Sequence, residues 1–142
     1  MKQNLLLIVV IIILIVVVAF TVSPRSYFSE IDNNPILQRI HQDFIALNPA
    51  YEVIPLREGS SAYTENKSVI TICLKDPDTG KMYDYGVYQY VAFHELAHMV
   101  SKDYGHGPEF QRNFKTILNA AVEKGIYDPN TIIPSNYCGI NN

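Results

Sequence analysis

The chain begins with a long run of apolar residues and then changes to a mixed pattern. Residues 5–22 contain a single polar residue, Thr21. In an α-helix this run spans roughly 27 Å, close to the hydrocarbon thickness of a bilayer. We therefore predict an uncleaved transmembrane anchor over residues 1–22, with the membrane contacted through residues 5–22. A cleaved signal peptide is the alternative, although such apolar stretches usually run only about 7–15 residues and end in a small-residue cleavage site.

The charges on either side of this run indicate a weak preference for one orientation. Lys2 precedes the run, whereas Arg25 follows it and is itself followed by Glu30 and Asp32. The positive-inside rule then favours a cytosolic N-terminus, with the rest of the chain outside the cell or in a lumen. Residues 23–34 are polar and include a proline, which is typical of a tether.

Beyond the tether, the hydrophobic pattern predicts one small α+β domain over residues 35–142. A helix should start at Asn34-Pro35, with Asn34 as its N-cap, and end before Asn48-Pro49. Two further helices are expected, from about 86 to 101 and from Gly107-Pro108 to a closing Gly125. Between the first two helices we expect β-rich runs at 51–56 and 68–74, a polar loop or wide hairpin at 57–67, and a short third strand at 81–84; residues 126–142 look irregular.

Composition narrows the classes of function. The 142 residues suffice for one domain, and residues 23–142 hold ten of the 11 basic residues and all 14 acidic ones. This acidic balance argues against an electrostatic nucleic-acid binder, so no nucleic-acid partner is expected. Two cysteines exclude a disulfide framework. In an oxidising compartment Cys73 and Cys138 could form a disulfide. The alternative, that both cysteines are unpaired and Cys73 lies in a strand, is equally compatible with the sequence.

Three of the four histidines lie within 13 residues and carry the candidate chemistry. His94-Glu95-Leu96-Ala97-His98 is an H-E-x-x-H motif. Four residues apart on a helix, His94 and His98 project from one face and can bind one Zn²⁺. Glu95 lies roughly 100° round the helix, where it can take a proton from a zinc-activated water instead of binding the metal. His41, on the flank of the first helix, is expected to be an ordinary surface or partly packed histidine.

A catalytic zinc site needs a third protein ligand and one open position. The metzincin pattern is excluded because positions 101 and 104 hold Ser and Tyr instead of Gly and His. His106 is the favoured ligand, since Gly105 and Gly107 on either side free the backbone to turn back to the helix. Two glutamates, Glu109 and Glu123, stay open as alternatives. Glu109 could instead orient His106 or cap the last helix.

The motif and its sequel, Gly105-His106-Gly107-Pro108-Glu109-Phe110, resemble the SprT-like and WLM group of zinc metallopeptidases over about residues 85–118. The resemblance implies a zincin-like fold, the metal ligands His94, His98 and His106, and Glu95 as general base. Sequences of this compact type also look similar to predicted metalloproteases of large DNA viruses. The chain departs from crosslink-cleaving SprT-like proteins, because it has no C-x-x-C pair, no basic region and an apolar N-terminus.

These observations predict a membrane-anchored zinc metallopeptidase that hydrolyses peptide bonds of a protein or peptide substrate. With so small a domain, we expect the substrate to be held by one edge strand and a shallow cleft. Tyr104 and Tyr137 are candidates to stabilise the oxyanion. Two alternatives stay open: a catalytically idle zinc-binding domain that binds a partner at the membrane, and a structural membrane protein with incidental histidines.

Overall fold

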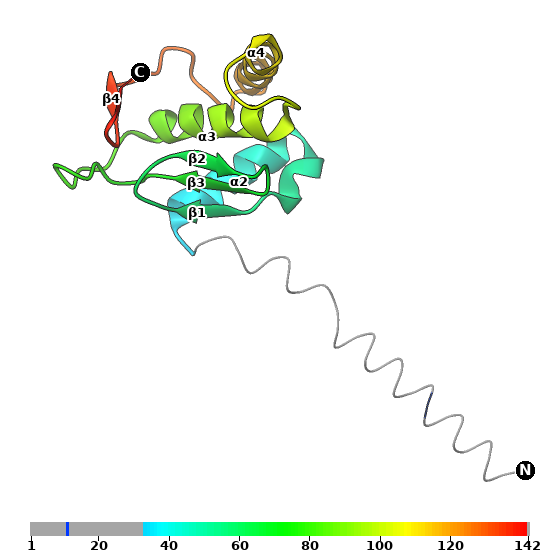
Figure 1. Ribbon diagram of the computed structural model, residues 1–142, viewed down its shortest axis with the longest axis horizontal. Coiled ribbons are helices and arrows are strands. Elements are labelled where there is room, and N and C mark those ends of the chain that lie inside the picture. Colours follow the sequence, from blue (N-terminus) through cyan, green and yellow to red (C-terminus); the bar gives the residue numbers. More distant parts are fainter. Residues whose placement is uncertain (1–10, 12–32, 142) are drawn as a thin grey trace, which may run out of the picture.

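The computed structural model describes Ile11 and residues 33–141 and confirms an α+β domain (Figure 1). The predicted anchor over 1–22 and nearly all of the tether over 23–34 lie outside the described residues. Within the described part, no helix has the length and apolar character needed to cross a membrane. The three long helices described are α2 (Pro35–Leu47), α3 (Tyr85–Val100) and α4 (Pro108–Glu123).

The predicted helix boundaries are confirmed to within a residue or so, and local signals account for the start of α2 and the end of α4. The Asn34 side chain accepts a hydrogen bond from the Ile36 amide at 2.9 Å, and Pro35 occupies the first turn of α2. At the far end of the domain, Gly125 follows α4 with a φ of +68°. Few residues other than glycine adopt that left-handed conformation at no cost.

A three-stranded sheet lies beside the helices, and its strands match the predicted β-rich runs only in part. Strands β1 (Leu56–Glu58) and β2 (Tyr63–Glu65) flank β3 (Val69–Ile72), in the order β1-β3-β2. β1 pairs with β3 in parallel, and β2 pairs with it antiparallel, so that β2 is an edge strand. The 57–67 segment, predicted as a polar loop or wide hairpin, therefore contributes residues to two strands, β1 and β2.

The prediction of a β-rich run at 51–56 is mostly wrong, because Pro49–Val53 form a 3₁₀ helix, η2. Asn48 explains the difference: its side chain accepts a hydrogen bond from the Ala50 amide at 3.0 Å and starts a second short helix directly after α2. The third strand predicted at 81–84 is reduced to one bridge between Lys75 and Met82. The tail predicted as irregular contains a hairpin of β4 (Asn136–Tyr137) and β5 (Ile140–Asn141).

The core lies where α2 and α3 pack against the sheet. Leu37, Ile40 and Phe44 of α2 belong to the same core cluster as Ile70 and Ile72 of β3, and all five are fully buried. Figure 1 shows α3 alongside the sheet and α4 on the side of α3 away from it. The central helix α3 is therefore covered on two sides. His94 and His98 lie in its C-terminal half, where both are partly exposed.

The two cysteines form a disulfide, which settles the alternative that the sequence left open. Cys73 follows β3 and Cys138 lies in the β4–β5 turn, 65 residues later in the chain. The bond therefore fastens the C-terminal hairpin to the sheet. His41 was expected to be a surface or partly packed histidine. It is buried instead, and its Nε2 donates to the Glu52 carbonyl at 2.8 Å.

Candidate metal centre

The structure brings together the three histidines that the sequence singled out. His94 and His98 lie one turn apart on α3, and His106 comes from the loop between α3 and α4. The Nε2 atoms are 3.2 Å apart for His94 and His98, 3.2 Å for His98 and His106, and 3.0 Å for His94 and His106. Within the described residues, these three make a group that could hold a metal ion.

Hydrogen bonding alone cannot satisfy this triangle of nitrogens. Each Nε2 atom carries either a proton or a lone pair, so at least one of the three contacts must join two donors or two acceptors. A single cation held by His94, His98 and His106 would accept all three lone pairs together. Zinc–nitrogen bonds of about 2.0–2.1 Å place tetrahedral ligands roughly 3.3 Å apart, close to the separations found here. The donor set therefore fits zinc.

Burial and neighbouring charges favour the neutral imidazoles that a metal requires. Burial, together with His98 and His106, lowers the pKa of His94 to about 4. The pKa of His98 is also lowered, first by burial and then by His106 and Lys67. A neutral ring offers the lone pair that coordinates a cation.

Phe110 on the first turns of α4 packs against all three histidine rings. It is stacked on His98 with ring centroids 4.3 Å apart, and it meets His94 and His106 nearly edge to face at 4.8 Å each. Phe110 itself is buried. The structure therefore makes Phe110 the common support of the histidine cluster.

Glu95 lies beside the histidines, and a residue that the sequence reasoning missed holds it. The hydroxyl of Thr64, on edge strand β2, is 2.8 Å from Glu95 Oε2 and 2.9 Å from the Glu95 carbonyl. Burial raises the pKa of the Glu95 carboxyl, and the Thr64 hydrogen bond partly opposes that rise. No local signal marks Thr64, because its role depends on β2 packing against α3.

The loop that carries His106 is fastened from both sides. Lys67, in the turn between β2 and β3, donates to the carbonyls of Ser101 and Lys102 at the end of α3. From α4, Glu109 Oε2 accepts hydrogen bonds from the amides of Lys102 at 3.1 Å and Asp103 at 3.4 Å. Glu109 therefore orders the loop and is not grouped with the histidines.

The two glycines beside His106 differ in what the backbone requires of them. Gly105 has a φ of +93°, which confirms the expected need for a glycine. Gly107 has a φ of −65° and is the N-cap of α4, so any residue could adopt its conformation. The expectation that both glycines free the backbone is thus wrong for Gly107.

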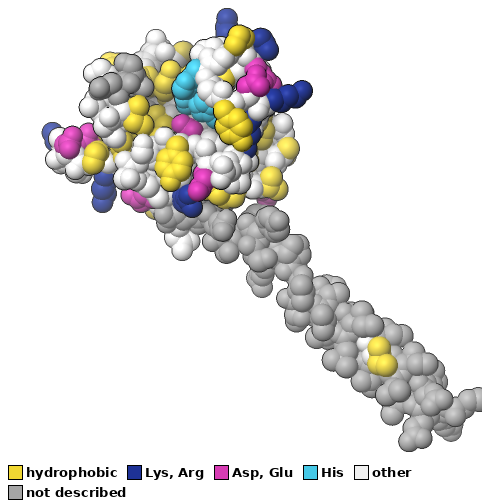
Figure 2. All heavy atoms as spheres, viewed as in Figure 1, with side chains coloured by type: hydrophobic (Ala, Val, Ile, Leu, Met, Phe, Trp, Pro, Cys, Tyr) yellow, Lys and Arg dark blue, Asp and Glu magenta, His cyan; other side chains and the backbone are white. Residues whose placement is uncertain are grey.

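An open cleft of about 360 Å³ runs between the histidines and the edge strand. In Figure 2, histidine atoms reach the surface beside a hollow, with acidic atoms inside it. Of the two tyrosines considered for the oxyanion, Tyr104 lines this cleft and is exposed. Tyr137 is buried, and its hydroxyl donates to the Cys73 carbonyl. Tyr104 is therefore the better placed of the two.

Comparison with known proteins finds viral relatives. The chain is 39% identical over 87 residues to uncharacterized protein 136R of Invertebrate iridescent virus 6, covering 60% of this chain and 49% of the relative. It is 35% identical over 83 residues to uncharacterized protein 042R of Invertebrate iridescent virus 3, covering 58% and 52% respectively. It is 28% identical over 92 residues to uncharacterized protein R325 of Acanthamoeba polyphaga mimivirus, covering 63% and 47%.

The chain thus spans about half the length of the curated relatives it matches. Their names state no activity. No protein-family model matches the chain, and no solved structure does. The resemblance to SprT-like and WLM metallopeptidases therefore stays a prediction.

Proposed function

We propose that this protein is a membrane-anchored, zinc-dependent metallopeptidase. His94, His98 and His106 would hold Zn²⁺, and Glu95 would act as general base. The observation that carries the proposal is the triangle of three Nε2 atoms 3.0–3.2 Å apart, which no arrangement of protons satisfies. A buried glutamate next to that triangle is the residue that hydrolysis would need.

The residues of the chain account for the proton transfers of peptide hydrolysis. A bound zinc ion supplies Lewis acidity that activates water and polarises the scissile carbonyl. Because the Thr64 hydroxyl donates to Oε2 of Glu95, we assign the proton of the attacking water to Oε1. Glu95 then delivers this proton to the leaving amine. Thr64 acts as a positioning residue, since it keeps the carboxylate turned toward the cleft.

The edge strand offers a way to hold a peptide across the site. β2 pairs with β3 on one side, and its residues Tyr63 and Thr64, with the preceding Ala62, line the cleft on the other. An extended peptide could add to this edge as a further strand, through main-chain hydrogen bonds that tolerate many sequences. This arrangement favours an unfolded segment of a protein as the substrate.

The proposed location is a membrane, with the domain outside the cell or in a lumen. The apolar run at 5–22 supports the anchor. The disulfide between Cys73 and Cys138 supports an oxidising compartment, because such bonds seldom persist in a reducing cytosol. Together with the weak charge preference around the run, these features favour a single-pass protein with a cytosolic N-terminus.

The test is a substitution that removes the base and keeps its shape. Glu95→Gln should retain zinc and thermal stability while cleavage of an unstructured protein falls by at least about 10²-fold. Glu123, one of the two glutamates considered as a third ligand, lies at the exposed end of α4 and is not grouped with the histidines. Glu123→Gln is therefore the matched control and should cleave like the wild type. If the zinc-loaded wild type cleaves nothing across a broad peptide library, the peptidase proposal fails and the idle zinc-binding domain takes its place.

A further inference from the structure

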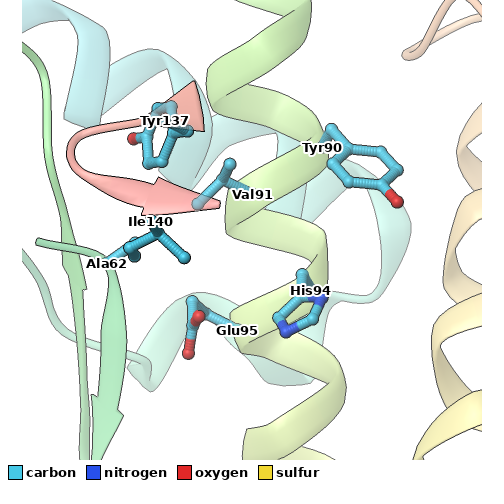
Figure 3. A pocket seen from close by; sticks show the side chains of 7 residues that line it. All are labelled: Ala62, Tyr90, Val91, His94, Glu95, Tyr137 and Ile140. Atoms are coloured by element: carbon cyan, nitrogen blue, oxygen red, sulfur yellow. The ribbon is translucent and has the colours of Figure 1, made fainter. Parts of the chain in front are cut away.

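A small cavity opens beside the cleft, on the side of the C-terminal hairpin. Its volume is about 80 Å³, and it shares His94 and Glu95 with the cleft (Figure 3). The rest of its lining is apolar or aromatic: Ala62, Tyr90, Val91, Tyr137 and Ile140. An apolar recess that begins at the candidate base is placed to receive a side chain of whatever molecule reacts there.

The hairpin that lines this cavity needs contacts with the rest of the domain to hold its position. β4 and β5 have two residues each, and isolated hairpins of any length are marginal in water. A disulfide and hydrogen bonds attach it to the rest of the described domain. Cys138 is disulfide-bonded to Cys73, the Tyr137 hydroxyl donates to the Cys73 carbonyl, and the Cys138 amide donates to the Tyr83 hydroxyl at 2.9 Å.

We propose that the disulfide-anchored β4–β5 hairpin is the specificity element of this protein. It forms the wall of a pocket for one aliphatic side chain of the substrate, next to the bond that is cut. The proposal rests on the peptidase function proposed above and adds the substrate class to it. Ile140 is the selecting residue, since it lines both the small cavity and the cleft.

Size and position identify the occupant. The cavity is several times larger than the 10–15 Å³ that one water needs, and smaller than the roughly 150 Å³ cavity that holds benzene. It therefore suits Val, Leu or Ile better than an aromatic ring. Ala62, at the cavity, directly precedes edge strand β2. A peptide paired with β2 would consequently pass the mouth of the pocket as it crosses the site.

The experiment maps where an aliphatic side chain binds, without requiring cleavage. The full-length chain in nanodiscs is incubated, with and without zinc, with an extended peptide that carries a photoreactive leucine analogue. Mass spectrometry then locates the crosslinks. We expect them in the β4–β5 hairpin and near Ala62, and we expect Ile140→Trp, which fills the pocket, to reduce them at least fivefold. Ile132→Trp, at a residue that is 88% exposed and outside the pocket lining, is the matched control.

Cleavage profiling gives the second readout. Wild type should prefer Leu over Ala at one position beside the cut by about tenfold, a discrimination within the range of a hydrophobic pocket. Ile140→Ala should shift this preference toward aromatic side chains. Cys73→Ala with Cys138→Ala should weaken it while zinc content stays unchanged. Because the hairpin would no longer be anchored, the crosslinks should also spread to residues outside it.

The two proposals fail in different ways. Crosslinks in the hairpin without any cleavage would support the pocket and reject the peptidase. Cleavage with crosslinks elsewhere, or with a preference that Ile140→Trp and Ile140→Ala both leave unchanged, would overturn the pocket and leave the peptidase standing.

Discussion

The two halves of the histidine cluster reach the same point by different means. His94 and His98 belong to α3, where four residues make about one turn and the backbone hydrogen bonds of the helix fix their spacing. His106 belongs to the loop between α3 and α4. It reaches the other two rings because Gly105 turns the backbone, Lys67 and Glu109 hold the loop, and Phe110 supports all three rings.

The difference shows that one half of the site is local and the other depends on the tertiary structure. Lys67 lies 34–36 residues away from the carbonyls it binds. Substitutions that disturb β2, β3 or α4 should therefore displace His106 more than they displace His94 and His98. Substitutions can test this contrast at four places: the histidines themselves, Phe110 that supports all three rings, Lys67 that holds the loop, and Gly105 that turns it.

Removing a proposed zinc ligand from either half of the cluster should have the largest effect. Both His98→Ala and His106→Ala should lower zinc affinity by more than about 100-fold, beyond what the loss of a residue outside the ligand set costs. Elemental analysis of the full-length variants, purified without chelator, measures the loss. His41→Ala is the control and should keep its zinc. Full zinc content in His106→Ala would show that the loop half contributes no ligand.

Removing the shared support should come next, because Phe110 is buried against all three rings. Phe110→Ala should destabilise the metal-free protein by about 3–5 kcal/mol, the usual range for a buried aromatic truncated to alanine. Chemical denaturation measures this change. Phe110→Leu should cost much less, since most of the volume is kept. Equal losses for the two variants would argue that ring packing, and not volume, stabilises the cluster.

Removing the distant contact should have a selective effect. Lys67→Met keeps the length of the side chain but cannot bind the carbonyls of Ser101 and Lys102. We expect zinc affinity to fall by about tenfold, as for other residues that support a ligand from outside. A competition titration with a zinc chelator measures this change. Lys102→Met, in the loop that Lys67 holds, is the control. An identical loss of zinc affinity in Lys102→Met would show that the Lys67 effect comes from the lost charge and not from the lost hydrogen bonds.

The smallest effect should separate the two glycines. Gly105→Ala should cost about 1–2 kcal/mol of stability, because φ is +93° there and a Cβ disfavours that conformation. Gly107→Ala should change stability by less than about 0.5 kcal/mol, since its φ is −65° and an added Cβ meets nothing within 4 Å. Thermal unfolding of both variants checks the difference. A larger loss at Gly107 would contradict this account of the loop.

Much of the fold could be predicted because its signals are local. The start of α2 at Asn34-Pro35 and the end of α4 before Gly125 follow from capping residues and glycine. The strands were predicted less well. Residues 51–56 have a β-rich composition, but the Asn48 cap makes η2 the better local structure. The β2 segment is polar, and pairing with β3 makes it a strand.

The candidate site divides in the same way. The spacing of His94, Glu95 and His98 on one helix was sufficient to predict that they lie together. The two glycines beside His106 predicted that its loop turns back to the helix, and the structure brings His106 to the other two histidines. Thr64 and Lys67 could not have been found, because each acts on a residue more than 30 positions away through a strand pairing that its own sequence does not indicate.

The sequence by itself determined the helices, the face shared by two histidines and the presence of a long apolar run, since these depend on residue type and on periods of a few residues. The tertiary structure alone decided the rest. It chose between a paired and an unpaired state for Cys73 and Cys138, and it closed the loop onto α3. It also placed the C-terminal hairpin beside Glu95. Contacts between distant segments are selected by the packing of the whole domain, which no short stretch of sequence specifies.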